Sequence, residues 1–385
     1  MTRRDALQRI VAAGVAFECA GLPIPLLGQS EEVVPFTDLP APAAPAAGAA
    51  PAAPRFDPRN LKEFVVPNDL FFAVQHYNVP KLDPATYALR IEGLVDKPIA
   101  LSLGDLKKRP RVEHVIGFEC SGNNNTRGNP LIGNARWAGT PLAPILKEAG
   151  LKATAREVVF FAGDSGPEEL NHSNAGNTPV KTEQHFARSL PVEDARMPDV
   201  MLAYQMNGED LPVAHGAPVR LIVPGWYGVA NVKWLNHIRV QDTRFMNRFM
   251  ARDYVTLQSE QDAGETYWYE TSVNRMRLKS AIARITRTGD RIKAVGFALT
   301  DGTPLKAVEV KVDDGPWKPA TMWKDNTPYS WKLFTFEWTG AAPGDHTIVS
   351  RAIDARGEVQ LPQDNATKKT RWENNGQVAR KFRLS

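Results

Sequence analysis

The chain has two cysteines, and because Cys19 lies within a predicted export leader, the mature protein keeps one thiol, Cys120. A single thiol cannot form an internal disulfide, a Cys-rich zinc site, an iron–sulfur cluster or a c-type haem attachment. Cys120 is therefore either a buried hydrophobe or a single soft ligand to a large group. A buried cysteine needs apolar neighbours, whereas the Gly- and Asn-rich run after Cys120 offers amides that can hold an anionic cofactor. These surroundings favour the role of Cys120 as a ligand.

The N-terminus predicts export. Arg3 and Arg4 precede a modest apolar stretch over residues 10–27, which is the layout of a twin-arginine signal, predicted over residues 1–30. Glu18, Pro23 and Pro25 interrupt the stretch, so it makes a poor membrane-spanning helix and we expect no membrane span in the mature protein. A weak amphipathic helix with a chance arginine pair is the alternative. The twin-arginine route carries folded proteins and leads to a periplasmic or otherwise exported location, which agrees with a cofactor on Cys120.

Length and composition indicate an ordinary globular protein with more than one domain. A chain of 385 residues predicts at least two domains. The Pro/Ala-rich stretch before Phe56 cannot bury a core, so residues 31–55 are predicted to be a linker. The net charge of +4 gives no indication of nucleic-acid binding, and it is compatible with an anionic ligand in a locally positive pocket.

Two regions with different patterns follow the linker. Residues 56–255 mix strands, predicted at 87–93, 157–163, 218–224 and 233–240, with a short helix at 141–150 that ends at a glycine. From residue 279 onward, short alternating strands are predicted at 282–285, 292–299, 308–312 and 334–338, with turn residues between them. This spacing is typical of an immunoglobulin-like antiparallel β-sandwich over residues 279–385. The boundary is predicted in the polar stretch 255–278.

Five segments together resemble the sulfite oxidase family of molybdenum enzymes. Their order and spacing carry the resemblance, and they lie at residues 71–87, 118–123, 135–142, 202–208 and 215–235. The resemblance implies an α+β fold, in which a sulfite oxidase-type molybdopterin-binding domain precedes an immunoglobulin-like antiparallel β-sandwich. In relatives the sandwich is a dimerisation domain, so a homodimer is expected.

The resemblance also implies a pyranopterin (molybdopterin) cofactor with molybdenum, and Cys120 matches the metal-ligating cysteine. A thiolate suits a polarizable metal that the cofactor's dithiolene already holds. Five residues match positions that hold the pterin and its phosphate, and Asn123 is expected to line the same groove; the five are His76, Asp164, His215, Arg220 and Lys233. Arginine and lysine pair with phosphate, and an acid accepts from pterin N–H groups. Without the family, a surface role for the two cations and a core role for His76 would be the simpler interpretations.

The substrate side departs from the family pattern. Tyr254 matches a tyrosine near the metal in relatives, where a phenol can donate a hydrogen bond and assist electron transfer; a tyrosine between the domains is the alternative. Relatives that oxidise sulfite bind it with arginines, but this chain has other residues at all three matching positions, Val74, Asn125 and Asn375. Arg127, Arg136 and Arg371 are nearby cations that can substitute. Loss of one charged partner of a bound anion costs about 1.5–3 kcal/mol.

By resemblance, the expected reaction oxidises sulfite to sulfate and passes electrons to an external acceptor. The chain has no Cys-x-x-Cys-His haem motif, so a separate protein such as a c-type cytochrome is expected. Val74 and Asn125 leave open another oxo-transfer substrate, either an S- or N-oxide or a less charged sulfur compound. A cofactor-free binding module is the alternative from another class.

Overall fold

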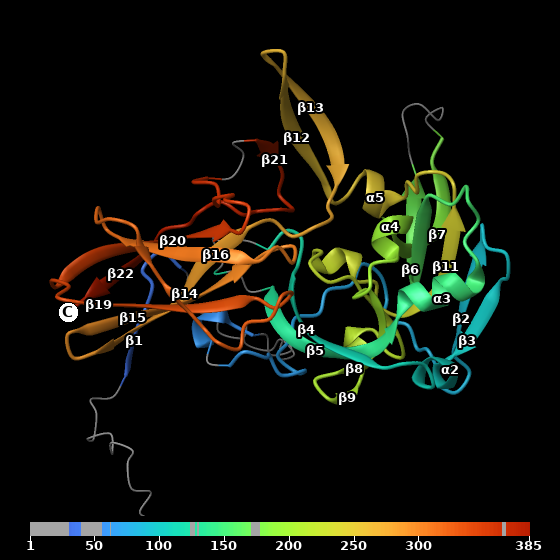
Figure 1. Cartoon of the computed structure of the whole chain (residues 1–385), viewed down its shortest axis with the longest axis horizontal. Coiled ribbons are helices and arrows are strands. Elements are labelled where there is room, and N and C mark those ends of the chain that lie inside the picture. The colour runs from blue at the N-terminus through green and yellow to red at the C-terminus, as the bar shows by residue number, and fades with distance from the viewer. Residues whose placement is uncertain are drawn as a thin grey trace, which may run out of the picture.

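The structure is a computed structural model that describes residues 31–39, 56–61, 63–123, 128, 131–170, 178–363 and 367–385. The predicted export signal, most of the predicted linker, Asn125 and Arg127 lie outside the described residues. Within them, no helix is long and apolar enough to cross a bilayer. Figure 1 shows a body rich in sheets, with the molybdopterin-type region at one end and the sandwich at the other.

The N-terminal region contains two five-stranded sheets connected by short helices. One sheet has the order β10-β8-β5-β4 with β9 beside β8, and the other has the order β3-β2-β11-β6-β7. Their strands are β2 (Ala88–Gly93), β3 (Ile99–Ser102), β4 (Val112–Glu119), β5 (Ile132–Pro141), β6 (Glu157–Leu170), β7 (Val180–Pro191), β8 (Met201–Met206), β9 (Glu209–Asp210), β10 (Arg220–Ile222) and β11 (Leu235–Gln241). The helices are η1 (Pro58–Asn60), α2 (Leu103–Lys107), α3 (Leu142–Ala149), α4 (Val192–Ala195), η4 (Val213–His215), η5 (Gly228–Ala230) and α5 (Arg248–Ala251).

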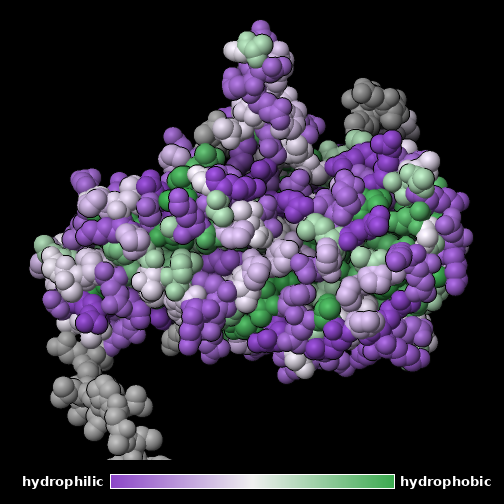
Figure 2. Space-filling model, in the orientation of Figure 1, coloured by the Kyte–Doolittle hydropathy of each residue, from purple (hydrophilic) through white to green (hydrophobic). Residues whose placement is uncertain are grey.

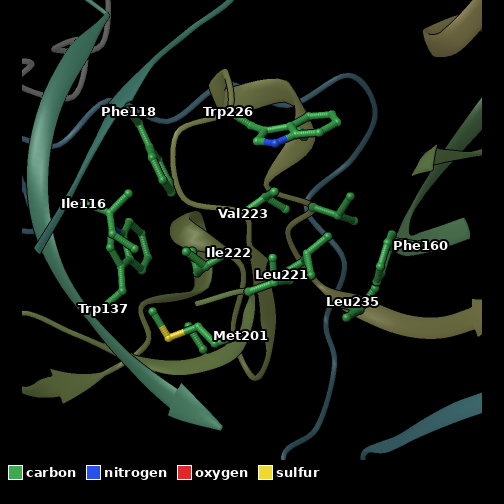
Figure 3. Close-up of a cluster of buried hydrophobic side chains, with 14 of the residues drawn as sticks. Ile116, Phe118, Trp137, Phe160, Met201, Leu221, Ile222, Val223, Trp226 and Leu235 are labelled. Carbon is green, nitrogen blue, oxygen red and sulfur yellow. The ribbon is translucent and has the colours of Figure 1, made fainter. Parts of the chain in front are cut away.

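The core of this region joins both sheets. Figure 3 shows Phe118 and Trp137 from one sheet, Leu221 from strand β10, and Phe160 and Leu235 from the other sheet around one apolar interior. All five side chains are fully buried. Burial of a large apolar side chain stabilises a fold by about 1.5–3 kcal/mol, so this interior fixes the positions of the loops at its edge.

The predicted helix at 141–150 is confirmed as α3. Leu142, Ile145, Leu146 and Ala149 are fully buried, and their spacing places them on one helical face. The helix ends at Gly150, whose φ of 71° lies in the left-handed region. A Cβ at this position would lie 2.7 Å from Asp96 Oδ2, so only glycine fits the close approach.

The predicted sandwich is confirmed as two packed antiparallel sheets. One has the order β1-β14-β15-β19-β18 and the other β17-β16-β20-β22. Ile285, Phe334, Val308 and Ile348 are fully buried between the two sheets. The strands are β1 (Glu32–Val34), β14 (Lys279–Thr288), β15 (Arg291–Leu299), β16 (Leu305–Val312), β17 (Lys318–Pro319), β18 (Thr321–Met322), β19 (Lys332–Thr339), β20 (Gly344–Asp354) and β22 (Arg380–Leu384).

The start of the predicted linker differs from the structure. Residues 32–34 form the edge strand β1, which pairs antiparallel with β14, and Phe36 forms a bridge with Phe382. Val34 is buried in the sandwich core. The Pro/Ala composition that indicated a linker begins only at residue 39, so the apolar residues before it are free to extend the sheet.

The predicted boundary at 255–278 contains a hairpin that the polar sequence did not indicate. Strands β12 (Val255–Asp262) and β13 (Glu265–Ser272) pair along their whole length, and β21 (Lys368–Lys369) pairs with the base of β12. Ala263 and Gly264 form the turn with positive φ values of 49° and 87°, as a tight hairpin turn requires. Figure 1 shows this hairpin, hereafter the arm (residues 255–272), projecting away from the body.

One buried ion pair joins the two regions directly beside Cys120. Lys279 Nζ, at the start of β14, lies 2.5 Å from Glu119 Oε1, at the end of β4. Both side chains are at most 2% exposed. Asn123 Nδ2 donates to the same carboxylate oxygen over 3.1 Å, so the pair also holds the loop that follows Cys120.

We expect Lys279→Met to lower the free energy of unfolding by about 3–5 kcal/mol, because it leaves the buried Glu119 carboxylate uncompensated. Adding Glu119→Gln should recover most of that loss, since replacement of both charges is often close to neutral. Urea denaturation measures both variants. As a matched control, Arg291→Ala breaks an exposed pair with Glu337 and should cost at most about 1 kcal/mol. An equal loss of unfolding free energy in Lys279→Met and Arg291→Ala would contradict a stabilising role for the buried ion pair.

Candidate active site

A cavity opens at the edge of the apolar core of the N-terminal region. Short segments far apart in the sequence form its wall. The cavity is lined by Phe72, Ala73, Val74, Gln75, His76, Cys120, Asp164, Phe186, Arg220, Gly228, Val229, Asn231, Lys233, Trp234 and Tyr254. Six of the sequence-predicted site residues therefore meet in one cavity: His76, Cys120, Asp164, Arg220, Lys233 and Tyr254.

Cys120 lies at the point where β4 leaves the core. Phe118, two residues earlier, is fully buried and anchors the strand, and the Cys120 N–H donates to Leu131 O over 3.0 Å. The thiol itself is partly exposed and lines the cavity. Within the described residues, no group of three or more His, Cys, Asp or Glu side chains is arranged to hold a metal. Cys120 can therefore contribute one sulfur ligand to a metal whose other ligands belong to a cofactor.

Arg220 and Lys233 supply two desolvated cations. The Arg220 guanidinium lies about 5 Å from the rings of Phe118 and Trp137 and donates to Asn231 O and His215 O. Burial lowers the pKa of Arg220 to about 9. Burial, with a further contribution from Arg220, lowers the pKa of Lys233 to about 7. Two cations that are costly to bury fit a site that receives an anion such as a phosphate.

Asp164 supplies an acceptor that the described protein atoms leave unmatched. The residue is 2% exposed, and its buried Oδ1 has no hydrogen-bond partner among the described residues. Burial raises the pKa of Asp164 to about 6, although nearby Lys233 acts in the opposite direction. A buried polar atom without a partner is costly. The N–H groups of a pterin would satisfy it, so the residues present fit a pterin with a phosphate tail.

Tyr254 and His76 form a hydrogen-bonded pair, with 2.6 Å between the phenol oxygen and Nε2. The His76 ring stacks on Phe186 at 4.5 Å, and burial lowers its pKa to about 4. A neutral imidazole can accept the phenolic proton. Burial, followed by the charge of Cys120, raises the pKa of Tyr254 above its usual range. Tyr254 also has a left-handed φ of 58°, which directs the chain from α5 into the arm.

Two predicted cofactor residues lie behind the cavity wall. His215 is buried, its Nε2 lies 2.8 Å from Asn68 O, and its own carbonyl accepts from Arg220. Asn123 is buried, donates to Glu119 and accepts from the Leu131 N–H. The backbone carbonyl of His215, rather than its side chain, thus contacts Arg220, the buried Nδ1 of His215 has no partner among the described residues, and Asn123 holds the Cys120 loop.

The substrate-side residues are divided between the cavity and its surroundings. Val74 lines the cavity and is 38% exposed. Arg371 lies outside the lining, with its guanidinium 4.5 Å from the Trp372 ring. Asn375 is buried and donates to Leu278 O. Arg136 pairs with Glu113 on the surface. Asn125 and Arg127 belong to the part of the chain that is not described.

Sequence reasoning missed Trp372 and Phe186. The Trp372 ring lies 4.5 Å from the Tyr254 ring and packs on Gly122, where an added Cβ would be 3.4 Å away. Phe186 supports His76. Neither residue has a charged group that would have marked it, but Trp372 directly follows Arg371, one of the candidate cations.

The cavity gathers donors that fit an anionic pterin and one cysteine sulfur that can serve as a ligand to its metal. A family model described as an oxidoreductase molybdopterin binding domain matches residues 76–249. The chain is 31% identical over 330 residues to sulfite oxidase of Gallus gallus, which covers 78% of this chain and 68% of that protein. The chain belongs to the sulfite oxidase family, and its cofactor is molybdopterin with molybdenum.

Other similar proteins support the same family. Mitochondrial sulfite oxidase of Homo sapiens is 31% identical over 78% of this chain, and the match spans only 58% of that longer protein. The crystal structure of the sulfane dehydrogenase SoxCD from Paracoccus pantotrophus has a TM-score of 0.71, with 23% identity over 96% of this chain and 94% of that chain. This structural match confirms the fold.

Stability of the cofactor-free protein should depend on pH through Lys233. The unfolded chain keeps the Lys233 proton up to its usual pKa of 10.5, whereas the folded chain loses it near pH 7. Between these values the unfolded state binds more protons, so the free energy of unfolding rises with pH. Urea denaturation at pH 7 and pH 9 should show this rise, and Lys233→Met should reduce it. The exposed control Lys147→Met should keep it. If Lys233→Met and Lys147→Met showed the same pH dependence of stability, Lys233 would not be its source.

Cys120→Ser should leave the fold intact and nearly abolish turnover, because a hydroxyl is a far weaker acid and a harder ligand than a thiol. Circular dichroism and steady-state assays of the molybdenum-loaded protein measure the two effects. Ser121→Ala is the matched neighbour, and it should keep its activity. Normal turnover in Cys120→Ser would refute the ligand role.

Proposed function

We propose that the protein oxidises sulfite to sulfate and passes two electrons to an external acceptor. Sulfite and water give sulfate, two protons and two electrons. The observation that carries this proposal is the meeting of Cys120, the Tyr254–His76 pair, the buried Arg220 and the partly buried Lys233 in one cavity. When bound, the cofactor supplies the oxygen-atom transfer and takes up the electrons.

The residues of the chain hold the cofactor and manage protons. Cys120 ligates the metal, Arg220 and Lys233 bind the pterin's phosphate, and Asp164 accepts from a pterin N–H. The Tyr254 phenol donates to Nε2 of His76, which burial keeps neutral. This pair can therefore take up a proton released from water at the cavity and pass it on through the imidazole.

The electrons are proposed to leave to a separate protein, for which a c-type cytochrome is the leading candidate. The sequence has no Cys-x-x-Cys-His motif that would attach a c-type haem to this chain. The partly exposed Trp372 ring contacts Tyr254, which lines the cavity, and follows β21, which pairs with β12 of the arm. This side is therefore the proposed exit.

A second candidate is a less charged sulfur compound, or an S- or N-oxide. Val74 lines the cavity at the position where relatives that oxidise sulfite have an arginine, and Phe72, Phe186 and Trp234 add further apolar surface. An apolar wall favours a substrate with less charge than sulfite. The sulfane dehydrogenase acts on a sulfur compound, as its name states, but at 23% identity its likeness concerns the fold alone.

Val74→Arg tests which substrate the cavity suits. If sulfite is the substrate, the added cation should raise kcat/KM for sulfite by about 10- to 100-fold, the equivalent of 1.5–3 kcal/mol. Val79→Arg adds the same charge at an exposed position outside the cavity lining and should change little. Parallel reductive assays use S- and N-oxides. Sulfite turnover in the parent no better than a free-cofactor control would exclude sulfite.

Metal analysis separates an enzyme from a cofactor-free binding module. We expect about one molybdenum per chain after purification from a strain that makes the cofactor, because the cavity already presents the donors that the cofactor needs. Absence of molybdenum and pterin from such a preparation would support the binding module.

Export and dimer formation are also proposed. Arg3 and Arg4 support the twin-arginine route to the periplasm. Signal cleavage before Glu31 would leave β1 in the sandwich. It would also keep the hydrogen bond that Glu31 accepts from Thr286. Homodimer formation through the sandwich is proposed from the family resemblance.

A further inference from the structure

The arm stands apart from the body and exposes large aromatic side chains. Tyr267, Trp268 and Tyr269 are 52%, 46% and 39% exposed, and Leu257 on the opposite strand is 40% exposed. Figure 2 shows the arm as a mostly hydrophilic column that projects from the molecular surface. A third strand, β21, pairs with only two residues of β12, and the rest of the arm is a two-stranded hairpin, so covering its exposed aromatic side chains would stabilise it.

The arm carries a charge opposite to that of the whole chain. Residues 255–272 contain four carboxylates, Glu260, Asp262, Glu265 and Glu270, and no lysine or arginine, which gives a formal charge of −4 against +4 for the chain. Lys369 Nζ lies 5.9 Å from the Trp268 ring at the base of the arm. A field of this sign repels a small anionic substrate and attracts a basic protein.

The arm begins at the catalytic cavity. Its first residue, Val255, directly follows Tyr254, which lines the cavity. Strand β21 pairs with β12 and belongs to the segment that places Trp372 against Tyr254. A protein that binds near the base of the arm is therefore held beside Tyr254, which lines the cavity, and Trp372, which contacts it.

We propose that the arm is the docking element for the electron acceptor, a redox protein with a basic face. The inference rests on the proposed function, because it requires electrons to leave to a separate protein. The carboxylates steer the acceptor to the surface, and the apolar contact that holds it comes from Tyr267 and Tyr269, which lie on the same face of the hairpin as Glu260, Asp262 and Glu265. A second copy of this chain would not need to lie beside the cavity, whereas an electron acceptor does, and this favours the acceptor.

The test uses a basic cytochrome c and an arm variant that combines Glu260→Gln, Asp262→Asn, Glu265→Gln and Glu270→Gln. At low ionic strength, KM for cytochrome c should rise about tenfold or more, and the difference should shrink as salt is added. The kcat with saturating ferricyanide should stay unchanged. A control variant neutralises four exposed carboxylates elsewhere and should keep the parent KM; its substitutions are Glu32→Gln, Glu193→Gln, Asp290→Asn and Asp314→Asn.

Tyr267→Ala tests the apolar contact, because Tyr267 lies on the same face as Glu260, Asp262 and Glu265. It should raise KM for cytochrome c at high as well as low ionic strength, because the lost contact carries no charge. Circular dichroism of the full-length holoenzyme checks that each variant is folded.

Binding of oxidised cytochrome c, titrated without substrate, separates this proposal from the proposed reaction. Weaker binding to the arm variant would support docking even if the parent failed to oxidise sulfite, which would count against the reaction alone. Equal binding and equal KM in the parent and the arm variant would overturn the docking proposal. A change from dimer to monomer in sedimentation, with unchanged cytochrome kinetics, would overturn it too and assign the arm to a second copy.

Discussion

The buried ion pair between Glu119 and Lys279 is the constraint on which the active-site geometry depends. It connects the last residue of β4 with the first residue of β14, and Cys120 is the next residue along the chain from Glu119. A buried pair of charges loses most of its stabilisation when its geometry changes, so it fixes the distance between the two regions. Asn123 donates to the same carboxylate and transmits this constraint to the loop beyond the thiol.

Two sites of the molecule carry charges of opposite sign: the cavity is cationic and suits an anion, and the arm is acidic and is proposed to bind a protein. Arg220 and Lys233 lie desolvated in the cavity, where they favour the phosphate of a pterin. The arm exposes its carboxylates to solvent, where they act over a Debye length of about 8–10 Å. The backbone at Tyr254 connects the two, because this residue lines the cavity and precedes the arm. In the proposed function, this arrangement keeps a small anionic substrate and a basic electron acceptor on separate surfaces.

Periodicity predicted the regular elements well because their signals are local. The apolar positions of α3 and the alternation in β14, β15, β16 and β19 each depend on a few neighbouring residues. The arm was not predicted, because most of its side chains are exposed and its polar sequence lacks an alternating apolar pattern. Strand β1 was missed for a different reason: three residues before a Pro/Ala stretch carry little periodicity, and their pairing with β14 is a contact between distant parts of the chain.

The sequence by itself determined the family, the cofactor and the identity of the one available thiol, because these depend on which residues occur and in what order. The sequence also predicted six site residues that line one cavity in the structure. Only the tertiary structure decided that His215 and Asn123 act from behind the wall, that Trp372 contacts Tyr254, and that Asn375 lies away from the cavity. The direction of a side chain depends on packing between segments far apart in the sequence, and residue type and spacing do not specify that packing.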